Sequence, residues 1–138
     1  MLDKMLLRAT KPAVEFVAGQ LRRRGVSADQ VTLTGFAGGV VAAGLIALGH
    51  PGLALWPLLF NRLCDGLDGA VARGSGASDR GAFLDISLDF IFYGLIPLAF
   101  ALMDPAANGV YAALLLAAFI GTGSSFLAYA ILAEKRGQ

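Results

Sequence analysis

The sequence contains little charge and almost no cysteine or histidine. Only 15% of its 138 residues are charged, and it has one cysteine and one histidine. A single cysteine excludes an internal disulfide, and the lack of a Cys/His cluster argues against structural zinc. The net charge is +1 and no long run of lysine or arginine occurs, so nucleic acid is not indicated as a partner. Motifs of zinc proteases, serine hydrolases and dinucleotide-binding enzymes are also missing.

The sequence is rich in hydrophobic residues. They make up 57% of the chain, and the mean hydropathy is +0.68. A soluble domain of this length would carry more charge, so the membrane is the expected solvent. The apolar segments predict four transmembrane helices, over residues 30–49, 53–73, 82–103 and 109–132. The predicted fold class is therefore an all-α integral membrane protein.

An amphipathic helix is expected to precede these spans, over residues 2–24. Its apolar positions recur at three- and four-residue steps, and basic residues occupy the other side. This pattern is typical of a helix in the membrane interface, with its basic face towards anionic headgroups. Pro12 is expected to kink or split the helix. The chain is accordingly divided into an interfacial helix, residues 1–27, and a transmembrane domain, residues 28–138.

The distribution of lysine and arginine predicts the orientation. The N-terminal segment, the 74–80 turn and the C-terminal end carry basic residues, whereas the 50–52 and 104–108 turns carry none. By the positive-inside rule, both termini and the 74–80 turn lie in the cytoplasm. We expect the membrane to be a bacterial inner (cell) membrane.

Four aspartates interrupt two of the apolar segments. Asp65 and Asp68 stand three residues apart, and Asp85 and Asp89 stand four apart, so each pair shares one face of a helix. The pairs lie at similar distances from the turn between them, so in an antiparallel helix pair the four carboxylates can converge. Because such carboxylates repel one another and are costly in a membrane, they favour hard divalent cations as partners. Two such ions could clamp a phosphoryl or pyrophosphate group.

The spacing of these residues resembles the signature of the CDP-alcohol phosphotransferases, integral membrane enzymes of phospholipid synthesis. The matching run is Asp65-x-x-Asp68-Gly69-x-x-Ala72-Arg73, followed after seven residues by Gly81-x-x-x-Asp85-x-x-x-Asp89. The segment Ala28-Asp29-Gln30-Val31-Thr32 is similar to the Pro-Asn-x-x-Thr of the family, with Thr32 matching and the first two positions departing. Family members usually have six spans, so this chain is expected to lack the last two family helices.

The resemblance implies a role for each matching position. Asp65, Asp68 and Asp85 would hold Mg²⁺ or Mn²⁺, as two ions, and Asp89 would be the general base, with a share in binding the second ion. The implied substrate-binding residues are Thr32, Gly69, Ala72, Arg73 and Gly81, although Thr32 could equally bond the helix backbone. The implied reaction transfers a phosphatidyl group from a CDP-alcohol, in the first place CDP-diacylglycerol, to an acceptor alcohol and releases CMP. A homodimer is a further expectation.

Two other interpretations compete with this one. The carboxylates could carry ions or protons across the membrane, which explains the acids but not the glycines and the arginine at their set spacing. They could also be structural, with Asp65 or Asp68 paired to Arg62 or Arg73 on the same helix, but two arginines are too few to pair with four aspartates. Arg62 could in addition bind a phosphorylated acceptor.

Overall fold

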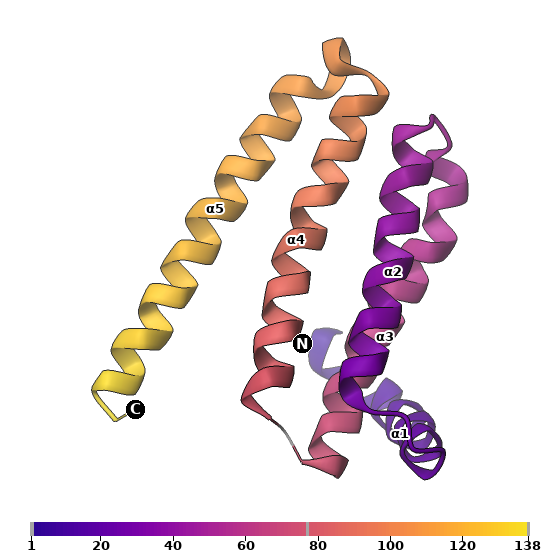
Figure 1. Cartoon of the computed structure of the whole chain (residues 1–138), viewed down its shortest axis with the longest axis vertical. Helices are drawn as coiled ribbons and strands as arrows, with labels where there is room; N and C mark the ends of the chain where they lie inside the picture. The colour runs from indigo at the N-terminus through magenta and orange to yellow at the C-terminus, as the bar shows by residue number, and fades with distance from the viewer. Residues whose placement is uncertain (1, 77, 138) are drawn as a thin grey trace.

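The computed structural model describes residues 2–76 and 78–137, with side chains from residue 10 onward, and this part of the chain consists of helices joined by turns, without a strand (Figure 1). The five helices are α1 (Leu2–Arg23), α2 (Ala28–Ala47), α3 (Pro51–Ser75), α4 (Asp79–Met103) and α5 (Pro105–Lys135). The side chains of residues 2–9, which carry part of the predicted amphipathic pattern, lie outside the described residues. The predicted all-α class is confirmed.

Three of the helices, α2, α4 and α5, are long and apolar enough to cross a membrane. Large apolar side chains such as Val41, Ile91 and Phe126 are exposed along them, as expected for helices in contact with lipid. Helix α3 has a comparable length of 25 residues but is not among the candidate spans within the described residues. Its second half is charged, with Arg62, Asp65, Asp68 and Arg73. The expected fourth span therefore stays a prediction.

Local sequence signals set where the helices begin. Ser27 begins α2 with a capping box, in which its hydroxyl accepts from the Gln30 N–H at 3.2 Å and the Gln30 side chain accepts from the Ser27 N–H at 3.0 Å. The side chains of Ser78 and Asp104 cap α4 and α5, and Pro51 stands at the start of α3, where no side chain caps the helix. Helices α2 to α5 begin at 28, 51, 79 and 105 rather than at the predicted 30, 53, 82 and 109. Helix α1 continues through Pro12, so Pro12 does not split it, and the kink that was the other expectation stays a prediction.

Helix α2 is the centre of the packing, because it lies against both α3 and α4. Two of its glycines permit this. A Cβ atom at Gly35 would lie 2.6 Å from the Cβ of Cys64 on α3, and one at Gly39 would lie 2.6 Å from the Phe92 ring on α4. Such small residues allow close helix approach in membranes. Within the described residues α3 and α4 make no close backbone contact with each other.

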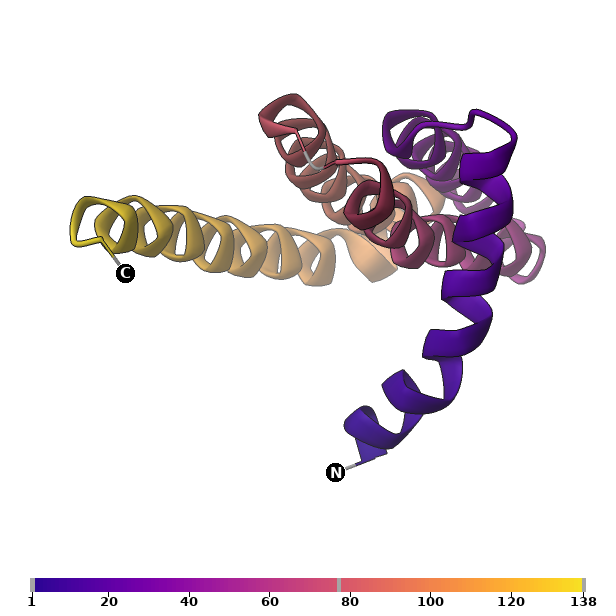
Figure 2. The ribbon, with the colours of Figure 1, turned by 90° about the horizontal axis from the view of Figure 1, so that it is seen from below.

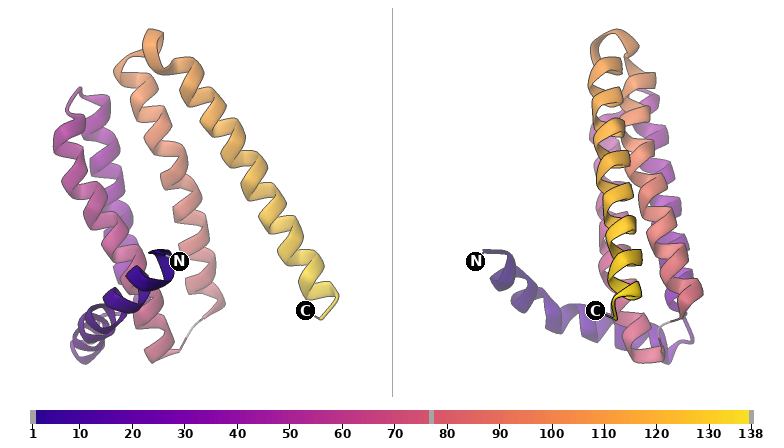
Figure 3. Two further views of the ribbon diagram at one scale, coloured as in Figure 1. Left: turned by 180° about the vertical axis from the view of Figure 1, so that it is seen from behind. Right: turned by 90° about the vertical axis from the view of Figure 1, so that its left-hand side faces the viewer.

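The connections alternate between two ends of the bundle. The turns that join α2 to α3 and α4 to α5 lie at the upper end of Figure 1, and the C-terminus lies at the lower end, as do the end of α3 and the start of α4. Helix α5 packs on α4 and diverges from the other helices towards its C-terminal end. Helix α1 lies across the lower end of α3 (Figure 2) and projects sideways from the bundle (Figure 3).

Candidate functional site

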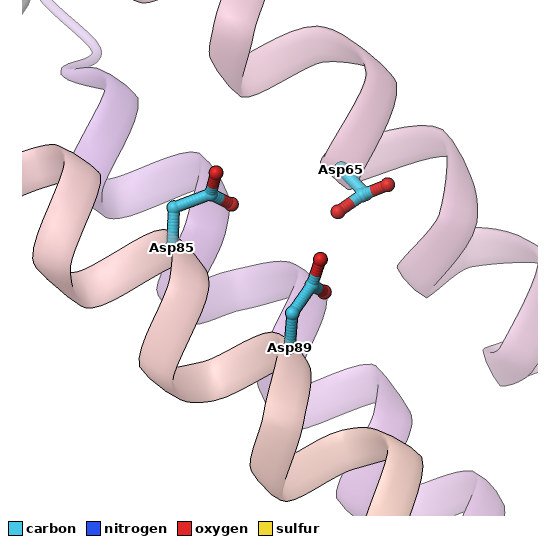
Figure 4. Close-up of side chains that lie close together, drawn as sticks. All are labelled: Asp65, Asp85 and Asp89. Carbon is cyan, nitrogen blue, oxygen red and sulfur yellow. The ribbon is translucent and has the colours of Figure 1, made fainter. Parts of the chain in front are cut away.

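Three carboxylates from two helices face one another in the space between α3 and α4 (Figure 4). Asp65 comes from α3, and Asp85 and Asp89 come from successive turns of α4. Each offers an oxygen atom that lies within 4.8 Å of the other two. All three are partly buried. The predicted convergence of the two helix faces is therefore observed for these three residues.

Asp68 lies beside this group, and its carboxylate has other partners. One oxygen, Oδ2, accepts a hydrogen bond from the Thr32 hydroxyl at 2.8 Å, and the other, Oδ1, accepts from the Gly69 N–H at 2.6 Å. Only 6% of Asp68 is exposed. The Thr32 hydroxyl also lies 3.1 Å from the Ala28 carbonyl oxygen, so it contacts both the backbone of its own helix and the site. Asp68 is thus held in place by α2, one helical turn from Asp65.

All four aspartates line one small pocket of about 10 Å³, together with Thr32 and residues of α2, α3 and α4. A larger cavity of about 330 Å³ adjoins it, and both are lined by Thr32, Asp68 and Asp85. Four of the five predicted substrate-binding residues line this larger cavity: Thr32, Gly69, Ala72 and Gly81. The structure therefore brings these predicted residues to one cavity that opens beside the carboxylates.

Arg73, the fifth predicted substrate-binding residue, is not part of the cavity lining. Its guanidinium lies 3.7 Å from the Glu15 carboxylate of α1, and its side chain is 68% exposed. It is still close to the cavity, because a Cβ on the lining residue Gly69 would lie 3.4 Å from its Nη1 atom. Helix α1 is also joined to this part of α3 by Arg22, whose Nη1 donates to the Ala70 carbonyl oxygen at 2.9 Å.

Arg62 forms ion pairs with carboxylates of two helices, Asp65 on α3 and Asp89 on α4. Its Nη1 atom lies 3.6 Å from Asp65 Oδ2, and its Nη2 atom lies 3.4 Å from Asp89 Oδ1. The three-residue spacing on α3 suggested the first contact. The second joins different helices, and no spacing within one helix could have revealed it. Neighbouring Asn61, which sequence reasoning missed, is buried and donates to the Gly35 carbonyl oxygen of α2 at 2.8 Å.

The donor set of the three-carboxylate group suits a hard divalent cation. It consists of carboxylate oxygens without histidine or cysteine, which is the ligand chemistry preferred by Mg²⁺, Mn²⁺ and Ca²⁺. The residues present therefore fit the predicted metal, although this chemistry does not select one of these ions. The adjoining cavity could admit an organic ligand whose charged part reaches the carboxylates.

Comparison with known proteins gives a family match along most of the chain. The family described as CDP-alcohol phosphatidyltransferase matches residues 26–137. Inner membrane protein YnjF of Escherichia coli is 51% identical over 135 residues, which cover 98% of this chain and 66% of that protein. A phosphatidylinositol phosphate synthase of Mycobacteroides abscessus is 38% identical over 121 residues, 84% of this chain and 47% of the synthase.

A second phosphatidylinositol phosphate synthase, from Streptomyces avermitilis, is 44% identical over 89 residues, which cover 62% of this chain and 36% of the synthase. The chain thus spans 66% or less of the length of each of these three relatives. No solved structure matches it significantly.

Proposed function

The chain belongs to the CDP-alcohol phosphatidyltransferase family, and we propose that it transfers a phosphatidyl group from CDP-diacylglycerol to an acceptor alcohol with release of CMP. One observation carries this proposal: a group of three carboxylates adjoins a cavity lined by Thr32, Gly69, Ala72 and Gly81. Transport of ions or protons, the alternative interpretation, explains the acids but gives no reason for Gly69, Ala72 and Gly81 in the cavity lining.

In this proposal Asp65, Asp68 and Asp85 hold two divalent ions, Mg²⁺ or Mn²⁺, and Asp89 has a share in binding the second. Bound ions would neutralise charge on the diphosphate of the substrate and on the departing phosphate. The chain prepares the site by fixing its own ligands. Asp68 is oriented by the Thr32 hydroxyl and the Gly69 N–H, and it borders both cavities. Asp65 and Asp85 present oxygen atoms from opposite helices.

The larger cavity is proposed to receive the cytidine and its phosphates. Gly69, Ala72 and Gly81 leave room there because their side chains are absent or short. A Cβ at Gly81 would already lie 3.2 Å from Asp29 Oδ1 and from Ser78 Oγ, so a larger side chain would narrow the cavity. Arg73, close to Gly69, supplies a positive charge near the phosphates.

Asp89 is proposed to take the proton from the acceptor hydroxyl. The acceptor oxygen then forms a bond to the β-phosphorus, the bond from that phosphorus to the bridging oxygen breaks, and CMP leaves with the bonding electrons. Asp89 and Asp65 line the small pocket but not the larger cavity. This supports approach of the acceptor from the side opposite the nucleotide, as displacement with attacking and leaving oxygens in line requires.

The activity is tested with purified protein and labelled CDP-diacylglycerol. A panel of acceptor alcohols is supplied, including inositol phosphate because two relatives are named phosphatidylinositol phosphate synthases. CMP release should require one of these acceptors together with Mg²⁺ or Mn²⁺, and a chelator should abolish it. Metal-independent release, or no release with any acceptor, would contradict the proposal.

For the membrane arrangement, we propose that α3 is a fourth span, that residues 1–27 contain an interfacial helix and that both termini are cytoplasmic. The sideways course of α1 and the alternation of the helix ends support this (Figure 3). In a Cys64→Ser background, Pro51→Cys and Ser78→Cys should react with an impermeant thiol reagent from opposite sides of the membrane. Labelling from the same side would refute the topology. The expected homodimer stays a prediction, to be tested by the mass of the protein–detergent complex.

A further inference from the structure

Arg62 contacts two of the three clustered carboxylates without lining either cavity. Its ion pairs with Asp65 and Asp89 are 3.6 and 3.4 Å long. In the part of the chain that the structure describes, the other ion pairs are Arg73 with Glu15 and Arg80 with Asp29, so no second basic side chain pairs with the cluster. The positive charge next to these acids therefore comes from Arg62.

The guanidinium of Arg62 is fixed by more than its two ion pairs. Its Nε and Nη2 atoms donate to Asn61 Oδ1 at 2.9 and 2.7 Å, and Asn61 is itself anchored to the Gly35 carbonyl oxygen of α2. The guanidinium carbon lies 4.6 Å from the centre of the Phe92 ring and 5.7 Å from that of Tyr93, both on α4. Hydrogen bonds and aromatic rings hold an arginine in one geometry, which a lysine cannot reproduce. The charge is thus preorganised by three helices.

A fixed cation at this position has two opposing effects on the site. It attracts the carboxylates of α3 and α4, which otherwise repel each other across helices that make no close backbone contact. It also repels any divalent cation that the same carboxylates bind, because both would share Asp65 and Asp89 as neighbours. The attraction stabilises the metal-free protein, and the repulsion weakens the binding of a divalent cation.

We propose that Arg62 is a built-in counter-ion of the metal site: it joins the acidic faces of α3 and α4 in the metal-free protein and lowers the affinity of the site for divalent cations. This inference rests on the metal site of the proposed function. It makes Arg62 a positioning residue that acts through Asp65 and Asp89. Direct binding of a phosphorylated acceptor is the competing role, and the absence of Arg62 from both cavity linings argues against it.

The test compares two neutral variants, Arg62→Gln and Arg62→Met, with the charge-retaining Arg62→Lys. Glutamine keeps a hydrogen-bonding group for Asn61, and methionine keeps an apolar contact for the Phe92 ring, so the two disturb packing differently while removing the same charge. Each protein is purified in Mg²⁺ and stripped with a chelator. The Mg²⁺ affinity is then measured by calorimetry, and thermal unfolding is followed with chelator and with saturating Mg²⁺.

Both neutral variants should bind Mg²⁺ at least ~10-fold more tightly than the wild type. They should also lose more thermal stability in chelator than in Mg²⁺, because the metal replaces the missing positive charge. Arg62→Lys keeps the charge but not its fixed geometry, so its Mg²⁺ affinity should lie between those of the wild type and the neutral variants. Arg80→Gln should bind Mg²⁺ like the wild type; it is a matched control that removes a positive charge paired with Asp29 at 3.6 Å, outside the cluster.

Any one of four results would overturn the inference. The neutral variants could bind Mg²⁺ with wild-type affinity, they could lose the same stability with and without Mg²⁺, as for a purely structural ion pair, or both could fail to fold even in Mg²⁺. A raised KM for a phosphorylated acceptor with unchanged Mg²⁺ affinity would also overturn it and assign Arg62 to the acceptor. Failure of the wild-type protein to bind any divalent cation would instead refute the proposed function.

Discussion

Replacing Thr32 with valine tests whether this residue positions Asp68 or binds the nucleotide. Valine has nearly the shape of threonine and lacks the hydroxyl, so the substitution removes the 2.8 Å hydrogen bond to Asp68 Oδ2 and creates no cavity. Asp68, which is 6% exposed, would retain the bond from the Gly69 N–H. The Ala28 carbonyl oxygen would lose the Thr32 hydroxyl as a donor, but the backbone hydrogen bonds of α2 would remain.

The size of the effect follows from the charge and burial of Asp68. A hydrogen bond to a charged group contributes about 1.5–3 kcal/mol to stability, and only 6% of Asp68 is exposed. We therefore expect Thr32→Val to lower the free energy of unfolding by about 1.5–3 kcal/mol in the absence of metal. If misplacement of the Asp68 carboxylate reduces the free energy of Mg²⁺ binding by the same amount, the Mg²⁺ affinity falls by ~10- to 150-fold.

The assay combines reversible unfolding in mixed micelles with Mg²⁺ calorimetry, and Thr32→Ser is the matched control. Serine retains the hydroxyl and should keep the Mg²⁺ affinity, with a loss of stability of at most about 1.5 kcal/mol for the missing methyl group. Equal weakening of Mg²⁺ binding in both variants would assign the effect to the methyl group. A raised KM for the CDP-lipid with unchanged stability and Mg²⁺ affinity would refute the positioning role and favour a nucleotide contact.

Two further predictions concern helix packing and metal ligation. Gly39→Ala should destabilise the protein by about 1–3 kcal/mol, because the added Cβ would lie 2.6 Å from the Phe92 ring. Gly44→Ala is the control and should not destabilise it, because the space around its Cβ is open. Thermal unfolding of both variants measures the difference. Asp65→Asn and Asp85→Asn should each weaken Mg²⁺ binding in calorimetry, because an amide oxygen is a poorer ligand than a carboxylate. Unchanged affinity in both aspartate variants would show that the metal lies elsewhere.

Much of the fold could be predicted from the sequence because its signals are local. The apolar segments marked the helices, and the four-residue spacing of Asp85 and Asp89 fixed their common face. The similar distance of the aspartate pairs from their turn also predicted that Asp65 would meet the α4 carboxylates, as it does. These inferences needed only helix periodicity and an antiparallel pair.

The remaining features depend on tertiary contacts that periodicity does not determine. Asp68 lies outside the three-carboxylate group, where the Thr32 hydroxyl of α2 bonds to it, and Arg62 reaches Asp89 because α2 and α4 fix its guanidinium. Arg73 meets Glu15 through the docking of α1 on α3, far away in sequence. Rotation of one helix against another decides each of these contacts.

The Asp89→Asn variant tests whether the carboxylates between α3 and α4 serve a phosphotransfer reaction. Asparagine keeps the shape of the side chain and an oxygen atom, but it cannot take a proton from an acceptor. We expect nearly normal affinity for CDP-lipid and Mg²⁺, with CMP release at least ~100-fold slower than in the wild type. Near-normal turnover would rule out Asp89 as the base, and lost Mg²⁺ binding would make Asp89 a metal ligand first.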